Sequence, residues 1–345
     1  MNYPTLKGVI GIVANDSKEI DLALNSKLSC VEIRADLLLN KGLSVEDVFE
    51  LVKNAKQKNL YCLFTLRHEL HGGKFYGTEK ERIQINRFAI DAGVNCIDLE
   101  WGTEAEFAMF KENAPLLISY HDFHSMPTDE ELEKLTLEIE EHCPLAIKVV
   151  PTASKIAHSV QILKWVKRAN KENVPRIGFA MGSHGSCSRI LATFYGSPIT
   201  YAAFGEAVAP GQISMDHILN SYRIPELEED FIIFGVAGEC VIDSESLGKM
   251  NNLLKKNHIR GISVPLEVNT LEELLTLVED LNIVGVQLDE PLKEIAIQKF
   301  PEMGKNYVES IFLDFMKNKV GSTYSIIPLS GYSYLKKKYE KEGSF

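Results

Sequence analysis

The chain has 345 residues, 45% hydrophobic and 25% charged, which suits a globular protein with one large and one small domain or two medium ones. Its net charge of −11 argues against a nucleic-acid-binding protein, because such proteins are usually basic. Since no apolar run reaches membrane-spanning length and the N-terminus does not resemble a secretory signal, we expect a cytoplasmic protein without membrane or nucleic-acid partners.

Short apolar runs rich in β-branched residues recur through the first two thirds of the chain. They predict eight strands, at 9–13, 30–37, 62–67, 96–101, 116–122, 145–151, 176–182 and 199–204. The intervening segments have helical spacing, most clearly at 128–142, where Thr128 is the expected N-cap, and at 154–170. Strands that alternate with helices pair in parallel. The α/β pattern with eight units predicts a (β/α)8 TIM barrel, with a doubly wound open sheet as the alternative.

A second, smaller α/β pattern follows a break near 220–231, which holds a proline and an acidic cluster. Strands are expected at 231–238, 259–267 and 283–288, and helices at 246–257 and 270–281. We place the boundary at residue 226, between a barrel domain of residues 1–226 and a small α/β domain of residues 227–345.

Polar residues cluster in the second half of several expected barrel strands. In a barrel these carboxyl ends converge on one mouth, where active sites lie. The residues are Glu32, Arg34, Arg67, Glu100, His121 and Lys148.

Lys148 interrupts the apolar run AIKVV. Burying an ammonium group is costly unless it is paired or loses its proton. A desolvated lysine can supply a neutral amine near pH 7, which attacks a ketone or aldehyde and forms a Schiff base. The alternative is a lysine that points outward and lays its stem between helices.

Two neighbouring strand ends supply groups that could assist such a lysine. His121 can take and return a proton near neutral pH, and the Glu100 carboxylate can orient its ring. Each could alone be a satisfied polar residue of the core. With Lys148, on three successive strand ends, they form a credible acid–base and covalent set.

Arginines indicate an anionic substrate, because a guanidinium binds a carboxylate with two hydrogen bonds. Arg34 and Arg67 end strands, and Arg189 follows the stretch AMGSHGSCS. That glycine-rich stretch lacks the phosphate-loop pattern and could be an anion-binding turn or a plain turn. The pairs of histidines in HELH (68–71) and HDFH (121–124) do not match the zinc-protease pattern, so we expect no catalytic metal.

At these residues the barrel part of the chain resembles type I 3-dehydroquinate dehydratase. The matching stretches occur in the order of that family: VEIRADLL, FTLRHELHGGKF, IDLEWG, SYHDF, IKVVP, GFAMGSHGSCSRI and AVAPGQIS. The resemblance implies a (β/α)8 barrel that uses a Schiff-base lysine and no cofactor.

The resemblance also implies a role for each matching position. Lys148 corresponds to the imine-forming lysine, His121 to the general acid–base, and Glu100 to the carboxylate that orients the histidine. The expected substrate-binding positions are Glu32, Arg34, Arg67, Arg189 and Gln212, with Arg189 as the carboxylate clamp. Val208 stands where some members have serine, so substrate affinity could differ.

The implied reaction removes water from 3-dehydroquinate and gives 3-dehydroshikimate, a step of the shikimate pathway. Lys148 condenses with the C3 ketone, His121 removes a C2 proton, and the C1 hydroxyl leaves as water. Two alternatives stay open: a class I Schiff-base aldolase and a non-catalytic protein that binds pathway intermediates. We expect the protein to form a homodimer. We expect its ligand to be this small-molecule substrate.

Residues 231–320 resemble, more weakly, the substrate-binding half of shikimate dehydrogenase. The stretch GVAGECVIDSESLGKMNN carries Ser244, Ser246 and Asn251 at that family's motif positions, and Lys293 in GVQLDEPLKE matches its catalytic lysine. These four residues are a possible remnant of a shikimate site.

Three neighbouring positions depart from the dehydrogenase pattern: Gln287, Asp289 and Leu292. No dinucleotide-binding GxGxxG motif follows a strand downstream. We therefore expect a truncated partner without dehydrogenase activity, with a structural or regulatory role.

Overall fold

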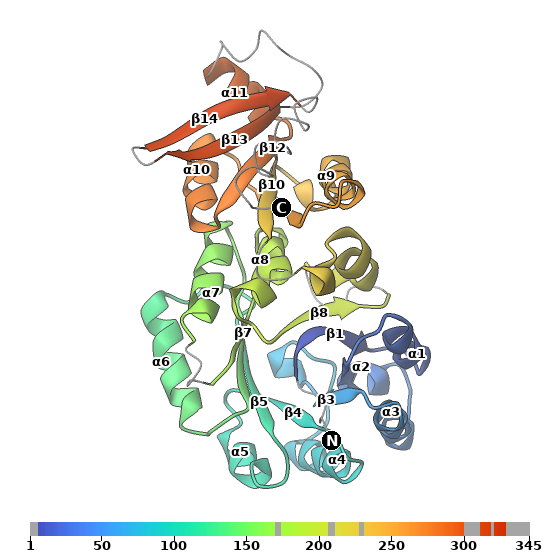
Figure 1. The fold of residues 1–345 in the computed structure, drawn as a ribbon. Helices are drawn as coiled ribbons and strands as arrows, with labels where there is room; N and C mark the ends of the chain where they lie inside the picture. The colour runs from blue at the N-terminus through green and yellow to red at the C-terminus, as the bar shows by residue number, and fades with distance from the viewer. Residues whose placement is uncertain are drawn as a thin grey trace.

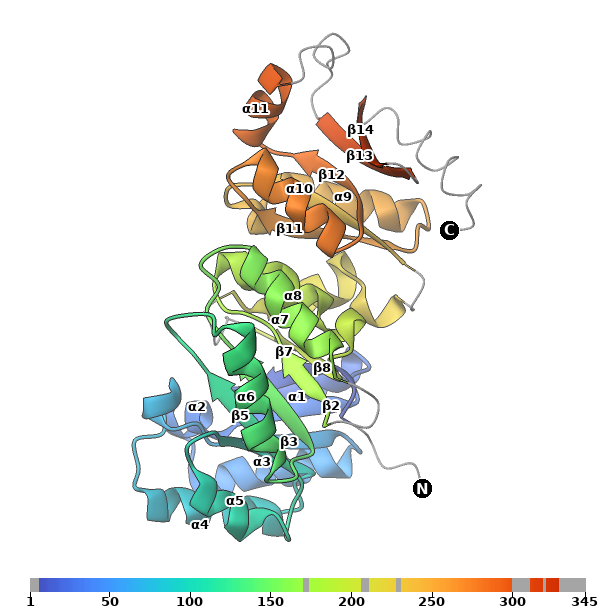
Figure 2. The same cartoon turned by 90° about the vertical axis from the view of Figure 1, so that its left-hand side faces the viewer.

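The computed structural model describes residues 6–169, 174–205, 211–227, 231–299, 311–318 and 321–328. These residues form two units (Figure 1), a larger one drawn blue to yellow and a smaller one drawn orange to red. The turned view (Figure 2) shows the smaller unit stacked on the side of the larger unit where α7 and α8 lie.

Eight parallel strands in barrel order form the first unit. They are β1 (Gly8–Val13), β2 (Cys30–Arg34), β3 (Tyr61–Thr65), β4 (Cys96–Glu100), β5 (Leu116–His121), β6 (Ala146–Val150), β7 (Arg176–Gly178) and β8 (Ile199–Ala203). They pair in the order β7-β6-β5-β4-β3-β2-β1-β8, and β9 (Ile213–Ser214) extends the sheet beside β8. The strand count and order confirm the predicted barrel topology. The described residues contain no β7–β8 ladder, but the rings of Phe179 and Tyr201 lie 5.6 Å apart across that seam.

Helices cover the outside of this sheet. They are α1 (Lys18–Asn25), α2 (Ala35–Asn40), α3 (Val45–Gln57), α4 (Glu79–Asp91), α5 (Glu104–Phe110), α6 (Asp129–Glu140), α7 (Ala157–Lys167) and α8 (Ser186–Leu191). The predicted N-cap at Thr128 is confirmed: its hydroxyl accepts from the Glu131 backbone N–H at 3.2 Å. The Glu131 carboxylate accepts in return from the Thr128 N–H at 2.8 Å, so a capping box starts α6.

The inward-facing side chains of the barrel divide into an apolar layer and a polar layer. Because side chains alternate along a strand, every second residue points inward. Toward the amino ends of the strands the inward residues are apolar: Ile10, Cys30, Tyr61, Leu63, Cys96, Leu117, Ala146, Ile177 and Ile199. A separate and larger apolar cluster lies between the sheet and its helices and continues into the second unit. Among the described residues, the charged side chains that face the interior therefore lie toward one end.

The second unit has a five-stranded sheet in the order β11-β10-β12-β13-β14. Its strands are β10 (Ile232–Gly238), β11 (Gly261–Glu267), β12 (Ile283–Leu288), β13 (Ile311–Asn318) and β14 (Gly321–Pro328). The first three are parallel, and the last two pair antiparallel. Its helices are α9 (Glu245–Lys256), α10 (Leu271–Asp280) and α11 (Leu292–Lys299). The predicted strands and helices of this segment are confirmed, whereas α11, β13 and β14 were not predicted.

The predicted boundary at residue 226 falls at the end of the short helix η5 (Ile224–Glu226), just before the second unit begins at β10. Among the described residues, every helix is too short or too polar to cross a lipid bilayer.

Candidate active site

A polar layer fills the carboxyl end of the barrel. Alternate positions on neighbouring strands supply it: Glu32 and Arg34, Thr65 and Arg67, Asp98 and Glu100, Ser119 and His121, and Lys148. Strand register places them side by side, since Thr65 pairs with Asp98 and Ser119 with Lys148. The predicted clustering of polar strand ends is therefore seen in the fold.

These side chains surround an open cavity of about 580 Å³, counted to its mouth. Seven of the eight residues predicted for the barrel site line it: Glu32, Arg34, Arg67, His121, Lys148, Arg189 and Gln212. Apolar side chains complete the wall: Ile12, Phe123, Val150, Phe179, Met181 and Tyr201. A cavity lined by both charged and apolar side chains suits a small, polar, anionic ligand.

Lys148 points into this cavity from β6 and is 5% exposed. Its Nζ donates to Asp98 Oδ2 at 3.2 Å and lies 4.0 Å from Glu32 Oε1. The Tyr201 ring lies below the amine, with its centroid 4.4 Å away. The inward orientation excludes the alternative of a lysine between outer helices. Pairing with carboxylates offsets the cost of burying the charge.

Asp98 is the residue that joins these groups, and the sequence reasoning did not single it out. It is buried, and it contacts Arg67 Nη2 at 3.0 Å as well as Lys148. The Ser119 hydroxyl donates to its Oδ1 at 2.5 Å. Burial opposes ionisation, but Lys148 and Arg67 hold the pKa of Asp98 below its usual value. The alternation of IDLE was the available signal, because it places residues 98 and 100 on one face.

His121 lies at the end of β5 beside Arg67. Arg67 Nη1 is 2.8 Å from Nδ1 of the His121 ring. A guanidinium can only donate, so Nδ1 accepts and the hydrogen of the neutral ring is on Nε2. Burial and the nearby charges of Arg67 and Lys148 hold the pKa of His121 well below 6.5. The ring is therefore neutral at pH 7 and able to accept a proton.

Glu100 lies behind Arg67 and is absent from the cavity wall. Its Oε2 accepts from Arg82 Nη1 at 3.1 Å, and its Oε1 is 4.0 Å from Arg67 Nη1. Arg82 also pairs with Glu106 of α5. In this structure Arg67 stands between Glu100 and His121, so the carboxylate reaches the ring through the guanidinium. The link between Glu100 and His121 in this fold is therefore indirect.

Burial raises the pKa of Glu100 to about 7, with Arg67 and Arg82 opposing the shift and Asp98 adding to it. The folded protein thus binds this proton more tightly than the unfolded chain does. Stability from Glu100 is complete below pH 4.5 and is lost as the pH rises through 7. Relative to Glu100→Gln, the wild type should lose on the order of 3 kcal/mol of unfolding free energy between pH 4.5 and 8.

Urea unfolding at several pH values measures this difference. Glu130→Gln, at an exposed position of α6, is the matched control and should track the wild type. A difference between the wild type and Glu100→Gln that does not change with pH would contradict the assignment.

The remaining arginines have different surroundings. Arg34 forms two hydrogen bonds of 2.9 Å with Asp36. Burial lowers the pKa of Arg34, but the carboxylates of Asp36, Glu32 and Asp98 together raise it above its usual value. Arg189, on α8, is 3% exposed, and burial lowers its pKa to about 10. Its guanidinium lies 4.6 Å from the centroid of the Phe179 ring. A carboxylate in the cavity would favour the charged form of Arg189 and offset its desolvation.

Loops after β3 and β5 form one side of the cavity mouth. Gly72 has a φ of +76°, and a Cβ there would overlap the Phe123 ring. Phe123 also stacks on His121, with ring centroids 6.2 Å apart. Phe123, which the sequence did not indicate, therefore fixes the outer face of the histidine. Val208 lies outside the described residues.

Of the four candidate residues of the second unit, Ser244 and Asn251 line one cavity, whereas Ser246 and Lys293 are not part of its wall. Ser246 donates to Asp289 at 2.7 Å, and Lys293 pairs with Glu290 at 3.5 Å. Ser244 is the N-cap of α9, accepting from the Leu247 N–H at 3.2 Å. The Asn251 amide binds backbone groups: it donates to Ser263 O and Leu247 O and accepts from Ser263 N. Its observed contacts link α9 to β11.

The two histidine pairs, at 68–71 and 121–124, lie in neighbouring loops at the mouth, because Gly72 is in contact range of the Phe123 ring. Among the residues that the structure describes, no three His, Cys, Asp or Glu side chains come together in a metal-binding group.

Comparison with known proteins gives consistent matches. The family model described as type I 3-dehydroquinase matches residues 10–229. The bifunctional 3-dehydroquinate dehydratase/shikimate dehydrogenase of Arabidopsis thaliana, a chloroplastic protein, is 29% identical over 275 residues. These residues are 78% of this chain but 44% of that relative, so the chain spans under half its length.

Two further matches extend this pattern. The 3-dehydroquinate dehydratase of Methanocaldococcus jannaschii is 31% identical over 206 residues, which cover 57% of this chain and 88% of that protein. The solved structure of dehydroquinate dehydratase and shikimate dehydrogenase from S. pombe AroM aligns with 97% of this chain and 67% of its own. Its TM-score is 0.55 at 18% identity, which indicates a shared fold across both units.

Proposed function

This chain belongs to the type I 3-dehydroquinase family, and we propose that it converts 3-dehydroquinate to 3-dehydroshikimate and water through an imine on Lys148. The observation that carries the proposal is the buried amine of Lys148 in one cavity with His121 and Arg189. Covalent attachment, proton transfer and carboxylate binding each have a side chain of suitable chemistry within that cavity.

The first step joins Lys148 to the substrate. The neutral amine attacks the C3 carbonyl, and water leaves as the iminium forms. Asp98 holds the amine in place at 3.2 Å, and Glu32 Oε1, 4.0 Å away, is a nearby carboxylate that can receive the proton that the ammonium releases. The iminium is an electron sink, and it acidifies the neighbouring C2–H.

His121 then serves as the base and the acid. Its neutral ring removes the C2 proton, giving an enamine, and the enamine expels the C1 hydroxyl, which takes a proton from His121 and leaves as water. Hydrolysis of the remaining iminium restores the ketone and frees Lys148. For Nδ1 to act as the base, the hydrogen bond from Arg67 must open.

Arg189 is proposed to bind the substrate carboxylate, with Arg34, Arg67, Glu32 and Gln212 around the hydroxyl groups. Arg189→Lys keeps the charge but loses the two-pronged geometry. We expect KM to rise about 10- to 100-fold with little change in kcat, the scale of one or two charged hydrogen bonds. Steady-state kinetics measures this. Arg168→Lys, a surface arginine of which 41% of the side chain is exposed, should match the wild type.

A trapping experiment tests the whole proposal. The intact chain is treated with sodium borohydride in the presence of 3-dehydroquinate, and the mass of the Lys148 peptide is measured. Reduction of the iminium leaves a permanent adduct, and the conjugated enone product absorbs in the near ultraviolet. An adduct without enone formation would indicate an aldolase, and neither signal would indicate a binding protein.

For the rest of the chain we propose a domain boundary at residue 226, a homodimer and a cytoplasmic location. We propose that the second unit has no dehydrogenase activity, because Ser246 and Lys293, two of its candidate site residues, pair with acidic side chains of the unit itself.

A further inference from the structure

Helix α8, which carries Arg189, is buried on all sides although it lies outside the barrel sheet. Each of its six residues, Ser186 to Leu191, is at most 3% exposed. An outer helix of a barrel ordinarily keeps a face in water. The barrel helix α7 packs against one side of α8, so the rest of its outer surface must be covered by another part of the chain.

The barrel side of this segment is held by side-chain hydrogen bonds. The Ser188 hydroxyl accepts from the Ala180 N–H at 2.9 Å and donates to Gly185 O at 2.6 Å. The Thr200 hydroxyl, on β8, donates to the carbonyl of Arg189 at 2.7 Å. These bonds fix the inner side of α8 and leave its outer side to be supported separately.

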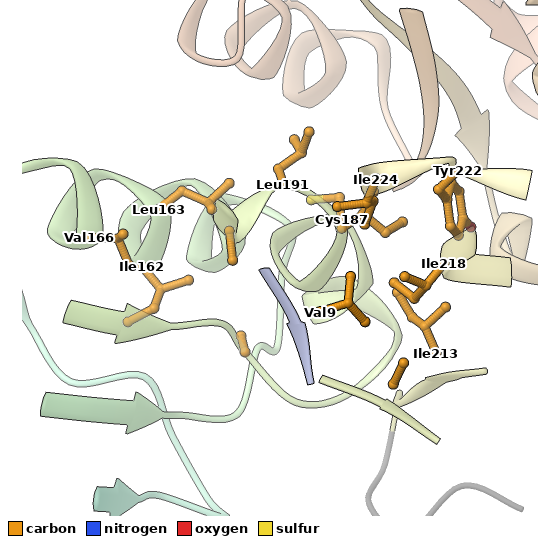
Figure 3. Packing of buried hydrophobic residues seen from close by; sticks show 14 of the residues in the cluster. Val9, Ile162, Leu163, Val166, Cys187, Leu191, Ile213, Ile218, Tyr222 and Ile224 are labelled. Carbon is orange, nitrogen blue, oxygen red and sulfur yellow. The ribbon is translucent and has the colours of Figure 1, made fainter. Parts of the chain in front are cut away.

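The second unit supplies that support. Strand β11 contacts α8 and the preceding short helix η2 (Ser183–Gly185). Leu191, fully buried, points from α8 toward the second unit (Figure 3), while Cys187 packs beside Ile224. Just after α8, the ring of Phe194 packs 4.2 Å from that of Phe231, next to the start of β10.

Strand β11 is an edge strand, yet all seven of its residues are buried. The backbone N–H and C=O groups of successive residues in a strand point to opposite sides. Those of Arg260 and Ile262 point toward β10, so those of Gly261, Ser263 and Pro265 point toward the open edge. Asn251 covers the N–H and C=O of Ser263, and proline has no N–H to leave open. The edge is closed to further strands, as expected of an edge that packs against another part of the fold.

Arg223 makes the polar link across this junction. It lies in the last segment of the barrel unit, is 9% exposed, and donates to Gly261 O at 3.2 Å and Ile259 O at 3.4 Å. Both carbonyls belong to the start of β11 or the residues just before it. A buried guanidinium therefore fixes β11 relative to the barrel.

We propose that the second unit acts as a buttress for α8 and thereby positions Arg189 for the substrate carboxylate, with Arg223 as the positioning residue of the junction. The role rests on the carboxylate-binding function proposed for Arg189. It gives the second unit a task in the dehydratase reaction, without any ligand of its own.

The test uses the full chain with Arg223→Met, which keeps the apolar stem and removes the guanidinium nitrogen that donates both hydrogen bonds. We expect KM for 3-dehydroquinate to rise five- to tenfold with kcat changed less than twofold, because only the carboxylate clamp is loosened. Lys164→Met is the matched control. It removes the Lys164–Asp280 ion pair between α7 and α10, which links the two units without involving a residue of α8 or β11, and should leave KM unchanged.

A double variant separates positioning from general weakening. If Arg223 acts through Arg189, then Arg223→Met should raise KM by less than twofold when Arg189 is already lysine. A full five- to tenfold increase in that background would overturn the proposal, as would an unchanged KM in Arg223→Met alone.

Hydrogen exchange of the amides of 186–191 gives a readout that does not depend on turnover. We expect faster exchange in Arg223→Met than in the wild type or Lys164→Met, and unchanged exchange would refute the buttress. If the wild type does not turn over 3-dehydroquinate, the proposed function fails, while hydrogen exchange still shows whether Arg223 is coupled to α8.

If Arg223→Met does not fold, Arg223→Lys can replace it. This variant keeps one donor and should show a smaller increase in exchange.

Discussion

Lys148→Ala is expected to reduce dehydration by on the order of 10⁴-fold or more, since Lys148 is the lysine among the described residues that line the cavity and the covalent route needs its amine. The remaining groups could still bind substrate, but none can replace the iminium as the electron sink. Turnover with 3-dehydroquinate and borohydride trapping measure the effect together. No adduct should form on the variant.

The fold of this variant should survive. Removing one partner of a buried ion pair usually leaves an unpaired charge, which costs about 3–5 kcal/mol. Here Asp98 keeps its 3.0 Å contact with Arg67 and the 2.5 Å hydrogen bond from Ser119. We therefore expect a smaller loss of stability, which thermal unfolding followed by circular dichroism would report.

Lys134→Ala is the matched control for Lys148→Ala, because Lys134 is an exposed lysine on α6, with 79% of its side chain in solvent. It should be fully active and should still form the adduct at Lys148. Wild-type turnover in Lys148→Ala would exclude the covalent scheme and leave a mechanism without an imine.

Much of the site could be predicted from the sequence because strand parity is a local property. Residues two apart on one strand face the same side, so Arg34 follows Glu32 and His121 follows Ser119 into the same layer. The count of strands then fixed a barrel, and the barrel fixed the end at which the polar layer lies. Lys148 could be predicted from another local feature, because it is a charged residue within an apolar strand.

The pairing within that layer could not be predicted, because it depends on distances between strands. Asp98 and Glu100 share one face of β4, and their sequence context does not say which one pairs with Lys148. The fold decides: Asp98 lies deeper and contacts the amine, whereas Glu100 turns toward Arg82 of α4. A role assigned to Glu100 by resemblance thus reaches His121 only through Arg67.

Contacts between the two units were likewise beyond the sequence. Asn251 matched a motif position of a ligand-binding family, but it binds the backbone of β11 in this fold. Arg223 lay in a segment considered only as a domain boundary. Their partners are distant in the chain, and no periodicity or local motif encodes such pairs.

His121→Ala is expected to lower kcat by about 10²- to 10⁴-fold, the usual contribution of a positioned acid–base group. Imine formation needs the Lys148 amine, so borohydride should still trap the substrate on this variant. The contrast between slow turnover and an intact adduct would separate proton transfer from covalent attachment. His124→Ala, three residues away and exposed, should behave as the wild type.

The pH dependence gives a second signature of His121. Burial, Arg67 and Lys148 hold the pKa of His121 well below 6.5, so the base form persists to lower pH than for an ordinary histidine. Protonation of His121 removes the base, so kcat/KM should fall on the acidic side with a midpoint below pH 6.5. This acidic fall should be absent from the residual activity of His121→Ala. Arg67→Lys should shift the midpoint of this fall upward, because the donor directed at Nδ1 would be displaced. An acidic fall that stays in place when His121 is removed would assign the base to another residue.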